Sequence, residues 1–152
     1  IQELVVNRLA TAMFELRKVG RIPPLMVVVE EAHNFCPQVG QVASSKVFRT
    51  LASEGRKFGL GLVIITQRAA KVDKNVLSQC NTQIILKVTN PNDLKAIVAS
   101  VEGLTTAMAE EIQRLPIGVA IVTGGGVQMP LLVEIRPRET KHGGESVKVI
   151  ED

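Results

Sequence analysis

Five consecutive apolar residues, Leu25 to Val29, run directly into two glutamates, Glu30 and Glu31. An apolar run of this length is typical of a strand that is buried on both faces at the centre of a parallel sheet. Such a strand delivers the residues that follow it to the carboxyl edge of the sheet, where ligands bind in open α/β folds. The sequence therefore predicts an α/β architecture with its paired acids at a binding edge.

Two adjacent carboxylates at such an edge can divide the work of nucleotide hydrolysis. Glu30 would hold Mg²⁺ through water, and Glu31 would polarise the attacking water. This is the Walker B arrangement of an NTPase. The same pattern also fits two solvated acids at the end of a strand, and taken alone it does not separate these interpretations.

Composition excludes several classes of protein. With 152 residues, 45% of them apolar, the chain can form a single domain with a sizeable core. A net charge of +3 permits nucleic acid as a partner, but four Phe and no Tyr or Trp argue against single-strand binding by aromatic stacking. Cys36 and Cys80 lack metal-ligand spacing, and no apolar run reaches the length of a membrane span. We expect reduced thiols, no membrane and a cytoplasmic protein.

Apolar periodicity predicts alternating helices and strands. Because helices separate the first three strands, we expect them to pair in parallel, while three glycines at 124–126 predict a hairpin between the last two. The expected fold is α/β, a mainly parallel sheet flanked by helices over residues 1–137, with a polar tail or arm over 138–152. The predicted helices cover 1–19, 45–58, 72–80, 91–101 and 106–115, and the predicted strands cover 25–29, 60–66, 82–89, 119–123 and 128–135.

The second predicted strand ends at Thr66, and Gln67 follows it. If it runs parallel to the first strand, both side chains reach the same edge as Glu31. There the Gln67 amide could hydrogen-bond a γ-phosphate and sense its loss, which makes Thr66 and Gln67 candidates for nucleotide binding. An ordinary loop amide is the alternative.

Arg56 lies at the far end of the helix that connects these two strands. About 14 helical residues at ~1.5 Å each carry the chain ~20 Å back down the sheet, away from a nucleotide bound beside Glu31. In a head-to-tail ring, Arg56 could instead reach the γ-phosphate of the neighbouring subunit, a task that suits its permanent charge. The alternative is a solvated helix face that Arg56 shares with Lys46, Arg49 and Lys57.

Three segments of the sequence together resemble a known family. They are VVVEEAHNF, SSKVFRTLASEGRKFGLGLVIITQR and GVAIVTGGGVQMPLLVEIRP. In this combination they are similar to the C-terminal half of the ATPase core of the HerA family. Proteins of this family are hexameric DNA translocases of the HerA/FtsK group, and the resemblance implies a RecA-like P-loop NTPase fold. The resemblance implies that Glu30 and Glu31 are the Walker B acids, that Arg56 is an arginine finger acting in trans, and that Gln67 is the sensor.

The resemblance also implies cofactors and partners. These are ATP and Mg²⁺, double-stranded DNA, a homo-hexameric ring in the full-length protein, and the nuclease NurA in the processing and repair of DNA ends. Arg68, Lys71 and Lys74 follow the sensor strand and are candidates for contacts with the DNA phosphates along a central channel. Scattered surface cations are the alternative for these three residues.

One essential motif of such an ATPase does not occur. The phosphate-binding loop G-x-x-x-x-G-K-[ST] is missing from the 152 residues. We therefore expect a fragment whose Walker A strand lies upstream of Ile1, and which neither hydrolyses ATP nor binds it tightly by itself. The sheet edge that would pair with that strand should be exposed and prone to self-association.

Two other interpretations remain open. EEAH is similar to the DEAH box of superfamily 2 helicases, although that group has an SAT-like segment where this chain has ITQR. The chain could also be a noncatalytic binding or assembly module with vestigial acids, in which the helix over 1–19 makes the contacts. His33 has no partner at metal-ligand spacing, so we expect it to hydrogen-bond beside Glu31 rather than to bind a metal.

Overall fold

The structure, a computed structural model, describes residues 1–101, 103–125, 127 and 129–141. Its α-helices are α1 (Gln2–Lys18), α2 (Ser45–Glu54), α3 (Lys74–Gln79), α4 (Pro91–Ser100) and α5 (Thr106–Arg114). Its strands are β1 (Leu25–Val29), β2 (Leu60–Ile64), β3 (Thr82–Ile85), β4 (Val119–Gly124) and β5 (Leu131–Glu134). Three short 3₁₀ helices, η1 (Ala32–Asn34), η2 (Gly55–Phe58) and η3 (Ala69–Lys71), complete the described elements. The predicted elements are therefore present, with their ends shifted by a few residues.

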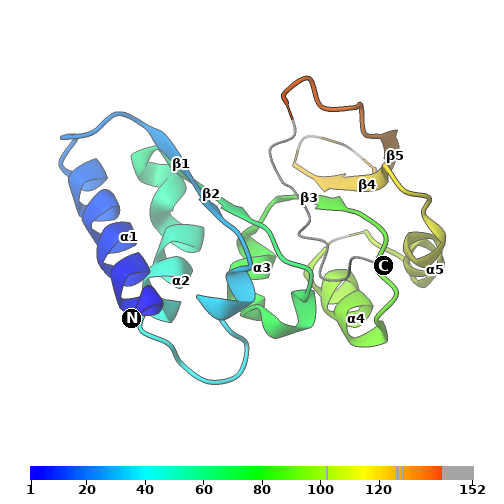
Figure 1. The fold of residues 1–152 in the computed structure, drawn as a ribbon, viewed down its shortest axis with the longest axis horizontal. Coiled ribbons are helices and arrows are strands. Elements are labelled where there is room, and N and C mark those ends of the chain that lie inside the picture. Colours follow the sequence, from blue (N-terminus) through cyan, green and yellow to red (C-terminus); the bar gives the residue numbers. More distant parts are fainter. Residues whose placement is uncertain (102, 126, 128, 142–152) are drawn as a thin grey trace, which may run out of the picture.

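The first half of the chain is built around β1 and β2, which lie side by side against α1 and α2 (Figure 1). The two strands pair in parallel, with Leu25 opposite Leu60 and Val29 opposite Ile64. Because the strands start and end in register, the residues that follow each of them emerge at the same edge. The parallel pairing predicted for these two strands is confirmed.

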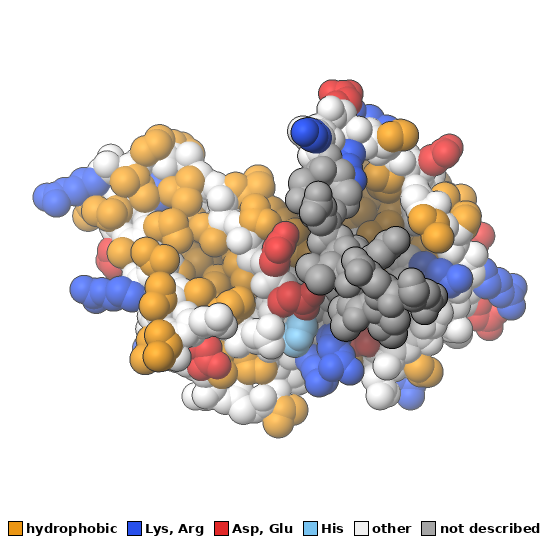
Figure 2. Space-filling view, in the orientation of Figure 1, with side chains coloured by type: hydrophobic (Ala, Val, Ile, Leu, Met, Phe, Trp, Pro, Cys, Tyr) orange, Lys and Arg blue, Asp and Glu red, His pale blue; other side chains and the backbone are white. Residues whose placement is uncertain are grey.

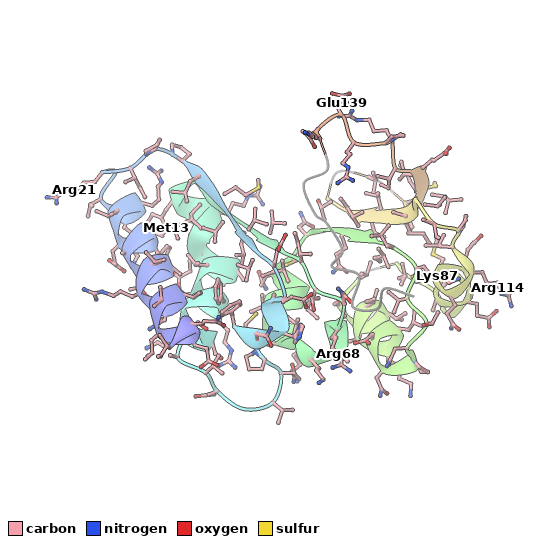
Figure 3. The ribbon with its side chains drawn as sticks, in the orientation of Figure 1. Met13, Arg21, Arg68, Lys87, Arg114 and Glu139 are labelled. Atoms are coloured by element: carbon pink, nitrogen blue, oxygen red, sulfur yellow. The ribbon has the colours of Figure 1, made fainter. Side chains whose placement is uncertain are left out.

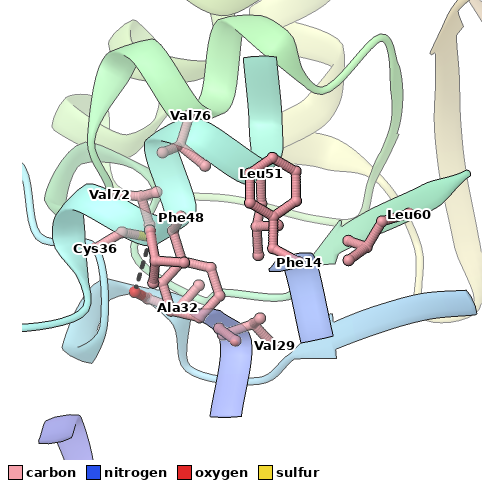
Figure 4. Packing of buried hydrophobic residues seen from close by; sticks show 11 residues of the cluster. Phe14, Val29, Ala32, Cys36, Phe48, Leu51, Leu60, Val72 and Val76 are labelled. Atoms are coloured by element: carbon pink, nitrogen blue, oxygen red, sulfur yellow. Dashed lines mark hydrogen bonds between the residues drawn. The ribbon is translucent and has the colours of Figure 1, made fainter. Parts of the chain in front are cut away.

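A hydrophobic core lies between this strand pair and its helices (Figure 4). Phe48 and Leu51 from α2 are each 1% exposed, and they point the same way because they are three residues apart on the helix. Phe14 from α1 packs edge-on against Phe58, with ring centroids 5.6 Å apart. Burial of each such side chain stabilises the fold by about 1.5–3 kcal/mol, so this core holds the strand tips in place.

The outer face of β1 differs from the prediction. Met26 and Val28 are 66% and 55% exposed, so burial alternates along β1 and only one of its faces is covered. Within the described part of the chain, no helix packs on the face that carries these two side chains, because α1 and α2 both lie on the other side. Figure 2 shows hydrophobic side chains gathered over this half of the molecule. The prediction of a central strand buried on both faces is wrong for this chain.

The third strand also pairs differently from the prediction. β3 is hydrogen-bonded to β4, antiparallel, with Thr82 opposite Gly124 and Ile85 opposite Ile121. In the described residues β2 and β3 belong to separate sheets. Two helices, α4 and α5, separate β3 from β4, and the chain re-enters the sheet beside the end of β3, so the pairing is antiparallel.

The predicted hairpin near the C-terminal end is present. β4 and β5 pair antiparallel, with Val119 opposite Glu134. Gly124 has a φ of +105°, and an added Cβ would lie 1.6 Å from the carbonyl oxygen of Asn81, so only glycine fits there. Gly126 and Gln128, also expected in this hairpin, lie outside the described residues, as do residues 142–152 of the predicted tail.

A second hydrophobic core lies between the antiparallel sheet and the helices α4 and α5. Ile112 from α5 is fully buried, and Ile121 from β4 is 4% exposed. Asn90 and Thr105 begin the two helices, and each side chain accepts a hydrogen bond from a backbone N–H of the first turn. Among the helices in the described residues, none combines the length and the apolar character that crossing a membrane requires.

Candidate functional site

The paired glutamates form the turn directly after β1. Glu31 has a φ of +48°, the only positive φ of a non-glycine residue in the described part of the chain. A left-handed conformation costs a side-chain-bearing residue about 1–3 kcal/mol, a strain that is concentrated at functional sites. The turn is held by a hydrogen bond from Ala32 N to Ile65 O at 3.1 Å and by one from Asn34 N to Glu31 O at 2.9 Å. The Glu30 and Glu31 side chains are thereby presented to solvent at the edge of the sheet.

The end of β2 brings its polar residues to the same place. The amide Nε2 of Gln67 donates a hydrogen bond to Oε1 of Glu31 at 3.4 Å. The two residues are 36 positions apart in the sequence and meet because their strands end in register. The structure therefore brings together the two side chains that the sequence placed at a common edge.

His33, on η1, joins this group. Its Nδ1 lies 3.2 Å from Oγ1 of Thr66 and 3.4 Å from Oε2 of Glu31. Oγ1 of Thr66 also accepts a hydrogen bond from the backbone N–H of Arg68 at 3.0 Å. Figure 2 shows acidic side chains next to a histidine at the centre of the face in view. His33 is thus beside Glu31, where a hydrogen-bonding role was expected.

The acids present the ligand type that Mg²⁺ prefers. Magnesium in nucleotide sites is held by one or two carboxylates together with waters and phosphate oxygens, rather than by a closed set of protein ligands. Glu30 and Glu31 are both exposed at the strand end, with room for such partners. Within residues 1–101, 103–125, 127 and 129–141, no group of three or more His, Cys, Asp or Glu side chains could hold a metal ion alone. The residues fit a nucleotide-bound Mg²⁺ and do not fit a structural metal site.

Arg56 lies away from this group. It is on η2, exposed, and precedes the first residue of β2, whereas Glu31 follows the last residue of β1. Five strand residues at ~3.3 Å each put about 16 Å of sheet between these two ends. The structure therefore does not bring Arg56 and Glu31 together within one chain.

The two loops beyond the strand tips are tied to each other. Backbone N–H groups donate from Gln38 to Lys71 O and from Asp73 to Cys36 O, both at 2.8 Å. The side chain of Gln38 also accepts a hydrogen bond from Lys74 N at 2.7 Å. The loop that carries the candidate DNA contacts is thus fastened to the loop that follows the acids. Arg68, Lys71 and Lys74 are all exposed, and Figure 3 shows Arg68 beside the turn that follows β2.

Sequence reasoning missed the residue that organises this region. Asp73 is 3% exposed, and its Oδ2 accepts a hydrogen bond from Nε of Arg49 at 2.7 Å and forms an ion pair with Nη2 at 2.6 Å. Its Oδ1 accepts from Asn75 N at 2.8 Å and so caps α3. Asp73 is the second residue of the helix predicted over 72–80, and an Asp so near the start of a helix was the available signal for the cap. The ion pair could not be read from the sequence, which assigned Arg49 to a solvated helix face.

The two cysteines are free thiols. Cys36 is fully buried, and its Sγ donates a hydrogen bond to Ala32 O at 3.2 Å (Figure 4). Burial, with smaller contributions from Asp73 and Cys80, raises the pKa of the Cys36 thiol to about 12. Burial also raises the pKa of the Cys80 thiol above its ordinary value. Both thiols therefore stay protonated near neutral pH, which makes them poor nucleophiles.

Comparison with solved structures identifies the fold. The genome packaging NTPase B204 from Sulfolobus turreted icosahedral virus 2, in complex with AMPPCP, superposes with a TM-score of 0.69 and 19% identity, over 87% of this chain and 64% of B204. VirB4 of Thermoanaerobacter pseudethanolicus superposes with a TM-score of 0.67 and 15% identity, over 91% of this chain and 38% of VirB4. The fold is that of part of a P-loop NTPase core.

Comparison of sequences identifies the family. No protein-family model matches the chain. The DNA double-strand break repair helicase HerA of Pyrococcus furiosus is 35% identical over 84% of the chain, that of Sulfurisphaera tokodaii 37% over 90%, and that of Saccharolobus solfataricus 39% over 84%. The chain spans 25–28% of the length of these relatives. Over that segment, the chain belongs to the HerA family.

Proposed function

We propose that this chain is the part of an ATP-driven double-stranded DNA translocase or helicase that carries the Walker B acids, the nucleotide sensor and a trans-acting arginine. The observation that supports it most directly is the hydrogen bond between Gln67 and Glu31, because it unites the sensor and the general base at one strand edge. The family relatives are named as DNA double-strand break repair helicases, which supports a role in DNA repair, in the cytoplasm with the DNA.

In this proposal each residue of the edge has its own task. Glu30 would hold Mg²⁺ through water, and Glu31 would take the proton of the attacking water. Thr66 and Gln67 would hydrogen-bond the γ-phosphate and respond when it leaves. ATP as the cofactor is supported by B204, a neighbour of the same fold that was solved with AMPPCP and ATP-gammaS.

The proposal requires a phosphate-binding loop from outside the 152 residues, because G-x-x-x-x-G-K-[ST] does not occur in them. β2 pairs only with β1 in the described residues, so its second edge has backbone groups available for another strand. A strand paired there would end beside Thr66 and Gln67. We place the P-loop strand at this edge, and we expect the chain without it to be inactive.

The assembly follows from the position of Arg56. An arginine that lies about 16 Å of sheet away from its own acids can complete only a neighbour's site, which favours a closed head-to-tail ring. We propose a homo-hexamer around double-stranded DNA, with Arg68, Lys71 and Lys74 near the phosphates. NurA as a partner is proposed from the family resemblance.

The test is hydrolysis by the full-length protein that contains this chain. Replacement of Glu31 by Gln should lower the rate of ATP hydrolysis by about 10²–10⁴-fold and leave Mg²⁺-dependent ATP binding intact, because it removes a general base and keeps the shape. Glu111→Gln, an exposed acid on α5, is the matched control and should have no effect. Full activity of the Glu31→Gln protein would refute the proposal.

One observation favours a noncatalytic assembly module as the second candidate. Leu4, Val5 and Leu9 on α1 are between 51% and 63% exposed, which leaves an apolar helix face available for a partner. In that case the full-length protein would fail to bind ATP in the presence of Mg²⁺. Calorimetric titration with ATP and Mg²⁺ therefore separates the two candidates.

A further inference from the structure

We propose that His33 is a positioning residue for hydrolysis, which holds the Glu31 carboxylate in one orientation by linking it to Thr66. This inference rests on the proposed function, in which Glu31 is the general base. It concerns the direction in which the carboxylate faces a water, and not the binding of the nucleotide.

The chemistry of the partners fixes which nitrogen carries the proton. An ionised carboxylate only accepts hydrogen bonds, so an approach of His33 Nδ1 to within 3.4 Å of Glu31 Oε2 is favourable when Nδ1 bears a hydrogen. The same N–H lies 3.2 Å from Oγ1 of Thr66, which can accept it as well. The two neighbours therefore select the imidazole form protonated at Nδ1.

This arrangement also determines what Thr66 can do. A hydroxyl oxygen has two lone pairs and one proton. The lone pairs of Thr66 Oγ1 are taken by the backbone N–H of Arg68 at 3.0 Å and by His33 Nδ1–H at 3.2 Å. The hydroxyl proton is left to donate, which suits a phosphate oxygen or a water next to Glu31. His33 therefore orients both a base and a donor.

The histidine is anchored far better than the glutamate beside it. Its side chain is 17% exposed and that of Glu31 is 49% exposed. Its turn is held by Ala32 and Cys36, both fully buried and joined by a hydrogen bond from Cys36 N to Ala32 O at 2.9 Å. A half-exposed glutamate that lacks such a neighbour occupies several rotamers, and ordering it costs conformational entropy.

The carboxylate is held from both sides. Gln67 binds Oε1 and His33 faces Oε2, so the two oxygens of Glu31 have separate partners on separate loops. When Gln67 turns toward a γ-phosphate, the interaction with His33 is the one that keeps the carboxylate in place. Removal of the His33 imidazole should therefore act on catalysis, while Thr66, still held by the N–H of Arg68, keeps its contact with the γ-phosphate and ATP affinity stays nearly the same.

The experiment is steady-state hydrolysis by the full-length protein carrying His33→Ala, His33→Asn or His33→Gln. We expect His33→Ala to lower kcat on the order of 10- to 100-fold, the effect typical of removing a hydrogen bond that orients a functional side chain, with KM for ATP within about twofold of wild type. An asparagine amide places its N–H where Nδ1 stands, so His33→Asn should recover most of kcat. A glutamine places it one carbon further away, so His33→Gln should not.

The controls separate this inference from a structural effect and from the proposed function. Asn34→Ala changes an exposed neighbour on η1 and should leave kcat unchanged, and thermal unfolding should show His33→Ala to be folded. On a Glu31→Gln background, His33→Ala should cause no further loss of activity. If Glu31→Gln abolishes hydrolysis while His33→Ala keeps kcat within about twofold of wild type, the positioning role of His33 is refuted and the proposed function stands. If Glu31→Gln has no effect, the proposed function fails as well.

Discussion

Arg56 and Glu31 lie at opposite ends of the parallel pair β1–β2. Glu31 comes two residues after the last residue of β1, and Arg56 comes four residues before the first residue of β2. Because Val29 is in register with Ile64, the length of a strand separates them within one chain. Arg56 and Glu31 therefore do not meet within one chain, and the role proposed for Arg56 requires a second subunit.

Subunit mixing tests this relationship. If Arg56 acts as proposed, Arg56→Ala in the full-length protein should lower ATP hydrolysis by about 10³-fold or more, the effect typical of removing an arginine finger, and Lys57→Ala on the same exposed turn should not. Mixing Arg56→Ala with Glu31→Gln subunits should restore part of the activity, because some interfaces then combine an intact arginine with an intact base. Two inactive proteins that stay inactive after mixing and exchange would contradict a role in trans.

The basic loop after β2 gives a prediction about DNA. Replacement of both Lys71 and Lys74 by Ala should reduce the stimulation of ATP hydrolysis by DNA. It should also make DNA binding less sensitive to salt: the slope of the logarithm of the binding constant against the logarithm of the salt concentration should become shallower by ~0.9 for each phosphate that the protein no longer neutralises. Basal hydrolysis should be unchanged. The double variant Lys87→Ala, Lys95→Ala changes two exposed lysines outside this loop and is the control for net charge. Equal DNA stimulation in the double variant and the control would remove these lysines from the interface.

The ion pair between Arg49 and Asp73 predicts a large change in stability. Arg49→Met should lower the free energy of unfolding of the 152-residue chain by about 3 kcal/mol, because it leaves the carboxylate of Asp73 buried without its partner. Lys46→Met changes an exposed cation on the same helix and should cost well under about 1 kcal/mol. Urea unfolding followed by circular dichroism measures both. Equal midpoints for the two variants would show that water replaces the guanidinium of Arg49.

The buried thiol of Cys36 predicts a dependence of stability on pH. Its pKa is about 12 in the folded chain against an ordinary 9.0, so above pH 9 the unfolded chain binds fewer protons than the folded one. The stabilisation from this group is complete below pH 9 and is lost as the pH rises toward 12, at ~1.4 kcal/mol per pH unit. Cys36→Ala should lack this part of the slope. Parallel slopes for the two proteins between about pH 9 and 11 would contradict the prediction.

The uncovered face of β1 predicts self-association of the isolated chain. Met26 and Val28 present apolar surface next to a strand edge that has no partner strand in the described residues, and such surfaces associate in water. The double variant Met26→Gln, Val28→Thr should shift the 152-residue chain toward monomer in sedimentation velocity. Ile117→Gln, a fully exposed apolar residue elsewhere, is the control. A wild-type chain that is monomeric at high concentration would end this prediction.

Local sequence was enough for the elements and for the acidic edge. Apolar spacing three and four residues apart located the helices, because this pattern depends only on residues within each helix. The meeting of Glu31 and Gln67 was predictable because parallel strands that start together also end together. These inferences depend on residues close together in the sequence and on the rule that parallel strands in register end at the same edge of the sheet.

The tertiary structure decided the burial, the strand pairing and the long-range contacts, because each of these depends on which part of the chain packs against a given residue. An apolar sequence indicates that a strand can be buried, but whether the Met26 side chain is covered depends on which elements pack on that face of β1. β3 could pair on either edge, and β4 determined the outcome. The interactions of His33 with Thr66, and of Arg49 with Asp73, join residues 33 and 24 positions apart. Hydrogen bonds require a defined distance and direction, and for residues so far apart only the packed fold provides both.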